Sequence, residues 1–152
     1  MDQQDSQKMP NSITLEPLDQ SGLTLHWPHI EEALRQSLGD NVETAAAQHA
    51  LRSDRLGAWA IWVPDGESNR VGGILITDTI QRGLSGGVAL SIYALHGTGI
   101  TNPQWIDTLG ALKDVCRARG IGHIVAITPH ENVVKLAQSL GFKVTSLLGM
   151  EV

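Results

Sequence analysis

The chain has 152 residues, of which 41% are hydrophobic and 18% are charged, and its formal net charge is −5. This composition fits one compact globular domain and excludes a disordered chain. The acidic balance argues against a nucleic-acid binder, which normally carries a basic surface, and no apolar run reaches the roughly 18 residues of a membrane span. Cys116 is the single cysteine and cannot form an internal disulfide, so we expect a protein of the cytoplasm.

The first fifty residues predict a polar tail, a strand and two helices. Residues 1–11 have almost nothing to bury, so we expect a flexible tail ahead of a single domain at 12–152. Residues 13–18 alternate as a strand does, and the turn formers of 19–22 follow. Apolar residues at helical spacing then predict two helices, at 27–38 and 45–51.

The middle of the chain predicts three strands. Residues 58–63 and 71–77 are apolar runs joined by the polar turn 64–69, which is typical of an antiparallel hairpin. After the glycine-rich residues 83–87, the run 88–95 is apolar on both faces. A strand with both faces buried is typical of the centre of a sheet that helices cover.

A further helix is predicted to begin near Pro103 and to end before Gly120. Asn102 is one N-cap candidate, with proline at the first helical position, and Thr101 with Gln104 forms an equally good capping box. The buried stripe of this helix is predicted at Trp105, Leu109, Leu112 and Cys116.

The last elements are predicted to be a strand, a helix and a closing strand. Residues 121–127 predict the first strand, and 128–131 form a second capping box. Gly141 ends the helix, Phe142 is placed to pack on its last turn, and 142–148 close the sheet. The buried stripe of this helix is predicted at Val133, Leu136, Ala137 and Leu140.

A glycine loop, His96-Gly97-Thr98-Gly99-Ile100, lies between the strand at 88–95 and the next helix. Free N–H groups in such a loop, with the positive end of the helix, can receive a phosphate or pyrophosphate. Alternatively, the two glycines only turn the chain. For the phosphate site, we expect the N–H groups of Gly97, Thr98, Gly99 and Ile100 to point toward the helix axis.

Two motifs and the order of the elements carry a family resemblance. Residues 96–101 stand where the family has an Arg/Gln-x-x-Gly-x-Gly/Ala loop, and 130–142 match an Asn-led helix that ends in Tyr-x-x-x-Gly-Phe. Over about residues 12–149, the chain resembles the GNAT superfamily of acyl-CoA-dependent N-acyltransferases. The resemblance implies an α/β (α+β) fold. It has a mixed twisted sheet of about six strands and helices on both faces, with 88–95 and 121–127 as parallel neighbours that splay apart at the loop.

The resemblance also implies acetyl-CoA as the cofactor. The residues that would hold it are Leu95, His96, Gly97, Thr98, Gly99, Ile100, Thr101 and His130. Three positions depart from the family pattern: His96 replaces Arg or Gln, Thr101 replaces a small residue, and Ala137 replaces the Tyr that often protonates the departing thiolate. Because a methyl group cannot donate a proton, we expect any acetyl transfer to be weak.

Tyr93 and Asp78 are the remaining candidates for catalysis. The hydroxyl of Tyr93, on the strand that would face the acyl group, could donate a proton, although a packing role explains it equally well. Asp78 could deprotonate an amine, although an Asp beside two threonines is usually a strand-end cap. The six histidines show no metal-ligand spacing, so we expect no metal. Cys116 is expected to be inert filling of a helix stripe.

Three functions stay open. The first is an acyl-CoA N-acyltransferase acting on a small-molecule or protein amine. The second is a non-catalytic virion or assembly protein in a phage particle or its host cytoplasm. This chain resembles the divergent GNAT-like proteins of tailed bacteriophages in three features: the Trp27 helix, the Gly97/Trp105 arrangement and the Gly141-Phe142 ending. The third is a CoA-binding module without transfer activity.

Overall fold

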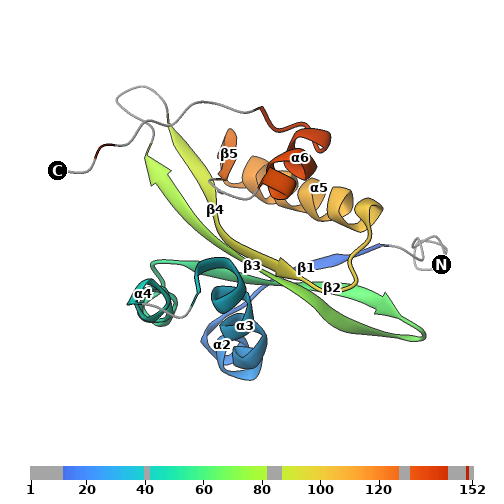
Figure 1. The fold of residues 1–152 in the computed structure, drawn as a ribbon, viewed down its shortest axis with the longest axis horizontal. Coiled ribbons are helices and arrows are strands. Elements are labelled where there is room, and N and C mark those ends of the chain that lie inside the picture. The colour runs from blue at the N-terminus through green and yellow to red at the C-terminus, as the bar shows by residue number, and fades with distance from the viewer. Residues whose placement is uncertain (1–11, 40–41, 82–86, 127–130, 144–149, 151–152) are drawn as a thin grey trace.

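The computed structural model describes residues 12–39, 42–81, 87–126, 131–143 and 150 (Figure 1). The tail predicted at 1–11 lies outside these ranges. Five strands form one sheet in the order β1-β2-β3-β4-β5. They span Thr14–Pro17, Gly57–Asp65, Ser68–Gln81, Val88–Gly97 and His123–Ala126. Neighbouring strands are antiparallel except β4 and β5, which are parallel.

This sheet confirms the predicted mixed topology. The strand predicted at 88–95 lies between two neighbours, and β5 is its parallel partner. The strand predicted at 142–148 falls largely on 144–149, outside the described residues, so five strands are described where about six were expected.

Helices cover both faces of the sheet (Figure 1). Helices α2, α3 and α4 lie on one face, and α5 and α6 lie on the other. They span Gln20–Leu25, Trp27–Leu38, Val42–Arg52, Asn102–Ala118 and Glu131–Ser139. None of the helices in the described ranges is long and apolar enough to cross a membrane.

The turn predicted at 19–22 was wrong, because α2 begins there. The Asp19 carboxylate accepts a hydrogen bond from the N–H of Gly22 at 2.8 Å and so caps the helix. The hairpin turn is also shorter than predicted. β2 extends to Asp65 and β3 starts at Ser68, and Gly66 adopts the positive φ of 67° that this tight connection requires.

Two hydrophobic cores hold the helices against the sheet. The core under α2, α3 and α4 includes Ile30, Leu34 and Ile76, which are fully buried. The core under α5 includes Ile61, Leu75 and Leu112. Leu75 and Ile76 are consecutive on β3 and point into different cores, as the alternation of a strand requires.

Helix α5 begins with the capping box that includes Thr101, not with Asn102 as N-cap. The N–H of Gln104 donates to the Thr101 hydroxyl at 3.3 Å, and the Gln104 side chain accepts from the N–H of Thr101 at 2.9 Å. The predicted stripe was wrong in its first half, because Gln104 and Thr108 are buried whereas Trp105 and Leu109 are half-buried. These polar residues tolerate burial because the Thr108 hydroxyl donates to the Gln104 carbonyl at 2.8 Å.

Helix α6 ends as predicted at Gly141, which has a φ of 99°. The N–H of Phe142 donates to the carbonyl of Ala137 at 3.0 Å, so the chain turns back over the last turn of the helix. Ala137 and Leu140 are half-buried. The capping box predicted at 128–131 falls on 127–130, outside the described residues, except for Glu131.

Candidate functional site

Strand β4 has an irregularity at Tyr93. Among the described residues, β5 pairs with β4 from Ala89 to Ile92, and β4 itself continues to Gly97. At the same point β4 has a bulge: Ile92 lies opposite Thr77 and Ala94 lies opposite Ile76, which leaves Tyr93 as the extra residue. A bulge bends the strand that carries it. The splay predicted between β4 and β5 stays a prediction, because residues 127–130, which follow β5, lie outside the described residues.

The glycine loop at the end of β4 offers fewer donors than predicted. The N–H of Thr98 donates to the Gly72 carbonyl at 2.8 Å, and the N–H of Thr101 is used by the capping box. Within the part of the chain that the structure describes, the N–H groups of Gly99, Ile100 and Asn102 have no hydrogen-bond partner. These three N–H groups stand at the start of α5, where the helix dipole favours an anion.

Ile100 holds this loop against the sheet. Its side chain lies against Gly72 and Gly73 of β3 and against Gly97 of β4, where added Cβ atoms would approach it to 3.4, 3.1 and 2.7 Å. The ring of Trp105 closes the contact at 3.0 Å from a Cβ placed on Gly97. These glycines are needed because the loop packs closely on the two strands.

Arg70 is a site residue that the sequence interpretation missed. Its guanidinium Nη2 lies 3.5 Å from the carbonyl of Gly99 and 2.7 Å from where a Cβ on Gly99 would stand. Gly99 itself has a φ of 68°, a conformation that glycine adopts without strain. A positive side chain from β3 thus stands beside the free N–H groups of the loop.

A cavity of about 240 Å³ lies beside the loop on the α3 side of the sheet. It brings His96 together with two residues of α3, His29 and Glu32, which the sequence interpretation did not connect with it. Its floor is formed by Val71, Gly72, Gly73 and Ile74 of β3, with Thr98 at the rim. A larger hollow of about 500 Å³ lies over β1 and β2, with Trp62 and Asn69 in its lining and no residue of the loop.

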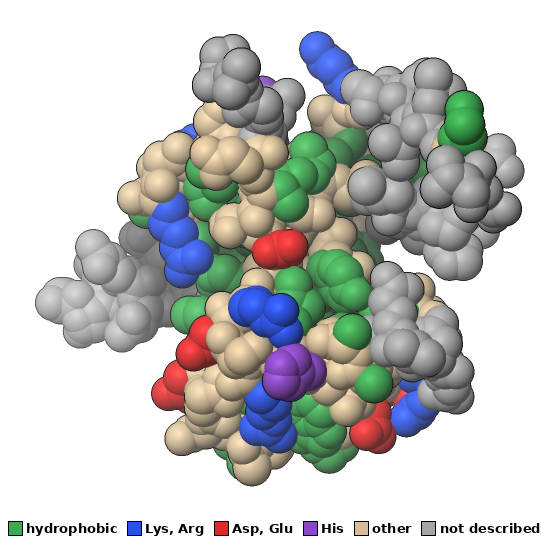
Figure 2. Space-filling model, turned by 90° about the vertical axis from the view of Figure 1, so that its left-hand side faces the viewer, with side chains coloured by type: hydrophobic (Ala, Val, Ile, Leu, Met, Phe, Trp, Pro, Cys, Tyr) green, Lys and Arg blue, Asp and Glu red, His purple; other side chains and the backbone are tan. Residues whose placement is uncertain are grey.

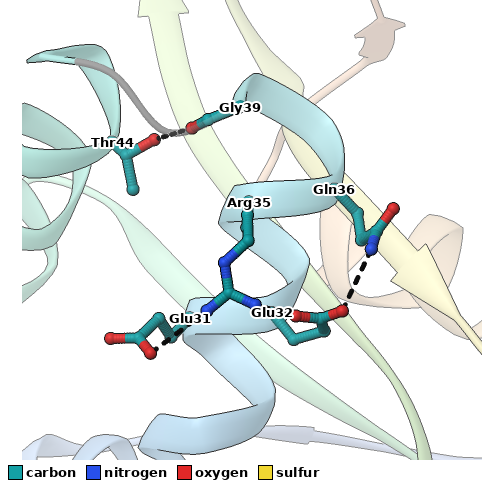
Figure 3. A network of polar contacts seen from close by, with 6 residues as sticks. All are labelled: Glu31, Glu32, Arg35, Gln36, Gly39 and Thr44. Atoms are coloured by element: carbon teal, nitrogen blue, oxygen red, sulfur yellow. Dashed lines mark hydrogen bonds and ion pairs between the residues drawn. The ribbon is translucent and has the colours of Figure 1, made fainter.

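The Glu32 carboxylate belongs to a polar network on the surface of α3 (Figure 3). It accepts a hydrogen bond from Gln36 at 3.0 Å, and Arg35 pairs with both Glu31 and Glu32. The hydrogen bond from Gln36, assisted by the charges of Arg35 and His96, lowers the pKa of the Glu32 carboxyl below its ordinary value. Glu32 is therefore an anion at neutral pH.

Tyr93 and Asp78 lie on neighbouring strands and face the same side of the sheet. Asp78 lies opposite Ser91, which is two residues before Tyr93. The neighbour Thr77 points into the core under α5, where its hydroxyl accepts a hydrogen bond from Trp59, so Asp78 points to the opposite face. Tyr93 packs half-buried against the core under α3. We expected Asp78 at the end of a strand, but β3 continues beyond it to Gln81. It lies within β3, and its carboxylate accepts from the N–H of Thr79 at 2.8 Å.

The other candidate residues lie elsewhere. His130 falls outside the described residues, and Ala137 lies on α6. Burial raises the pKa of the Cys116 thiol, which suits a packed and unreactive cysteine. Among the described residues, no cluster of His, Cys, Asp and Glu could hold a metal ion. On the face shown in Figure 2, acidic, basic and hydrophobic side chains are interspersed, and two basic side chains lie on either side of a histidine in the lower centre.

Comparisons with known proteins agree on one fold. No protein-family profile and no curated protein matches the sequence. An aminoglycoside N-acetyltransferase solved in complex with CoA is 14% identical, with a TM-score of 0.65 over 93% of this chain and 95% of that one. A possible acetyltransferase from Clostridium difficile 630 is 12% identical, with a TM-score of 0.67 over 93% and 97%.

A third solved structure is an aminoglycoside acetyltransferase from an uncultured soil metagenomic sample, in complex with sisomicin. It is 14% identical, with a TM-score of 0.64 over 92% of this chain and 94% of that one. These likenesses cover nearly the whole of each chain, so the protein has the fold of the GNAT acetyltransferases. At such low identity they show the fold alone, and function depends on the site.

Proposed function

We propose that the protein is a cytoplasmic acyl-CoA-dependent N-acyltransferase that transfers an acetyl group slowly to a small-molecule amine. The observation that carries the proposal is the loop at the start of α5, where the N–H groups of Gly99, Ile100 and Asn102 have no hydrogen-bond partner among the described residues. An open strand edge can receive an extended amide chain, and the loop can receive the diphosphate at its end.

The residues of the loop and its neighbour Arg70 fit the diphosphate of acetyl-CoA. Gly99, Ile100 and Asn102 would donate their N–H groups, and the guanidinium of Arg70 would add a positive charge. Thr98 and Thr101, two of the residues predicted to bind the cofactor, would contribute no N–H group, because both are already bonded. Because Gly99 has no side chain, the guanidinium of Arg70 can lie against the loop.

The chemistry requires two proton transfers. When bound, acetyl-CoA supplies a thioester whose carbonyl carbon forms a bond with the amine nitrogen while the carbon–sulfur bond breaks. Asp78 would accept the proton that the amine loses, and the hydroxyl of Tyr93 would give a proton to the departing sulfur. Because Ala137 occupies the position of the usual acid, transfer depends on Tyr93 and is slow.

Calorimetric titration with acetyl-CoA, coupled to thermal unfolding, tests the proposal. At a hundredfold excess over its dissociation constant, a ligand stabilises the fold by about 2.7 kcal/mol. Gly99→Val should abolish this gain, since valine cannot adopt the positive φ without strain and its side chain would displace Arg70. Gly120→Val, at a positive φ outside the loop, controls for strain alone. Absence of a thermal shift in the wild type with millimolar acetyl-CoA would refute the proposal.

A second candidate is a non-catalytic virion or assembly protein on the same fold. Ala137 favours it, because a chain without the family's usual acid can persist for its shape. It predicts the protein in fixed stoichiometry in purified phage particles and no acetylation of any amine. Robust acetylation of a defined amine, with absence from particles, decides for the enzyme.

A further inference from the structure

A serine of α3 bonds to the backbone of β4 near the end of the strand. The Ser37 hydroxyl donates to the carbonyl of Leu95 at 3.2 Å and accepts from the N–H of Leu95 at 3.3 Å. One side chain thus bonds both polar backbone groups of one residue, 58 positions away in the sequence. Ser37 lies in the last turn of α3, which packs against β4.

The position of Ser37 follows from the buried face of α3. Ile30 and Leu34 are fully buried, and Ser37 continues their stripe at i, i+4 and i+7. The end of the helix is held by the N–H of Gly39, which donates to Arg35 at 2.8 Å, and by the Thr44 hydroxyl, which donates to Gly39 (Figure 3). The stripe therefore ends in a polar residue that meets the strand edge.

The groups that Ser37 bonds are those that face away from β3. Leu95 lies opposite Leu75, and in an antiparallel pair alternate residues direct their N–H and C=O groups toward or away from the partner strand. Three residues further on, Thr98 donates to Gly72 of β3, which fits this alternation. Leu95 lies beyond Ile92, the last residue of β4 that pairs with β5 among the described residues, and Ser37 bonds both of its outward backbone groups.

We propose that Ser37 is an internal competitor for the edge of β4, and that an extended amide ligand binds there by displacing its hydroxyl from Leu95. The inference rests on the proposed function, which identifies the ligand as the amide-containing arm of coenzyme A. An amide of that arm has one N–H and one C=O, the same pair of groups that the single hydroxyl of Ser37 replaces.

The exchange needs no movement of the backbone. A serine hydroxyl leaves its position by rotation about χ1, while Ile30 and Leu34 keep α3 in place. Ser37 thereby lowers the affinity of the arm, because its bonds to Leu95 must break before the ligand can make its own. It is a specificity residue, since it also excludes ligands that cannot form both replacement bonds.

Calorimetric titration of Ser37→Ala with coenzyme A tests the proposal. In the variant, Leu95 bonds only water before binding, and the net contribution of one hydrogen bond corresponds to about fivefold in a dissociation constant. We expect coenzyme A to bind about fivefold more tightly. ADP, which has the diphosphate but no amide arm, should bind both proteins equally. Ser37→Thr keeps a hydroxyl and should restore the affinity of the wild type.

Two further measurements make the outcomes distinct. Amide hydrogen exchange at Leu95 should be faster in Ser37→Ala, because the N–H has lost its acceptor. Ser68→Ala, which removes a hydroxyl bonded to Asp65 in the β2–β3 turn, is the matched control and should leave the affinity unchanged. Equal affinity of Ser37→Ala and the wild type for coenzyme A would overturn the proposal alone. Failure of both to bind coenzyme A would overturn the proposed function and this inference with it.

Discussion

Replacing Gly73 by alanine should destabilise the fold and disturb the loop. A Cβ at this position would lie 2.8 Å from the backbone carbonyl oxygen of His96, 3.1 Å from Ile100 and 3.2 Å from Ile61. No rotamer change relieves a contact with backbone, so β3 and β4 must separate where His96 enters the loop. Overpacking of this kind costs about 1–3 kcal/mol.

Urea denaturation measures this cost, and Gly110→Ala is the matched control. Gly110 lies within α5, where an added Cβ meets nothing within 4 Å. Alanine in a helix interior is favoured over glycine by roughly 0.5–1 kcal/mol, so the control should be more stable than the wild type. The two substitutions add the same methyl group and are expected to change stability in opposite directions. A Gly73→Ala protein as stable as the wild type would show that β3 and β4 do not meet in this register.

Three other predictions concern single side chains. Arg70→Ala should weaken coenzyme A binding by about 10- to 100-fold, because a hydrogen bond to a charged group is lost. The control Arg55→Ala, which changes an exposed arginine, should have no effect. Equal weakening by both would contradict the role of Arg70. Tyr93→Phe should remove acetyl transfer and change the free energy of unfolding by less than about 1 kcal/mol. Retained transfer would exclude Tyr93 as the acid. Burial raises the pKa of Cys116, so the folded state keeps a proton that the unfolded state loses above about pH 8.5. The free energy of unfolding should therefore be unaffected by this group below that pH and should fall above it. In urea denaturation, Cys116→Ala should lack this fall.

The fold could be predicted to the extent that its signals are local. Gly39, Gly120 and Gly141 end helices or follow their ends, and all three have positive φ values. The apolar run at 88–95 placed β4 in the interior of the sheet because no other position buries both of its faces. The turn predicted at 19–22 was wrong because Asp19 is equally suited to a turn and to a helix N-cap, and only packing decides between them.

The candidate site depends on contacts that no local pattern contains. Ser37 meets Leu95 across 58 residues, and Arg70 reaches Gly99 across 29. Both contacts depend on how α3 crosses the sheet and how β3 pairs with β4, which the sequence of either segment does not specify. The serine at the end of the Ile30–Leu34 stripe was a usable signal, because a polar residue on a buried face needs a partner.

The glycine loop shows why a motif can overstate a binding site. A phosphate cradle and a helix cap use the same N–H groups at the start of a helix. Here the cap takes two of them, since Thr101 and Gln104 satisfy each other, and Gly72 takes the N–H of Thr98. Thr101 therefore matters less for its bulk than for its hydroxyl, which closes the cap. With three N–H groups left, the loop needs another source of positive charge, and Arg70 on β3 is placed to supply it.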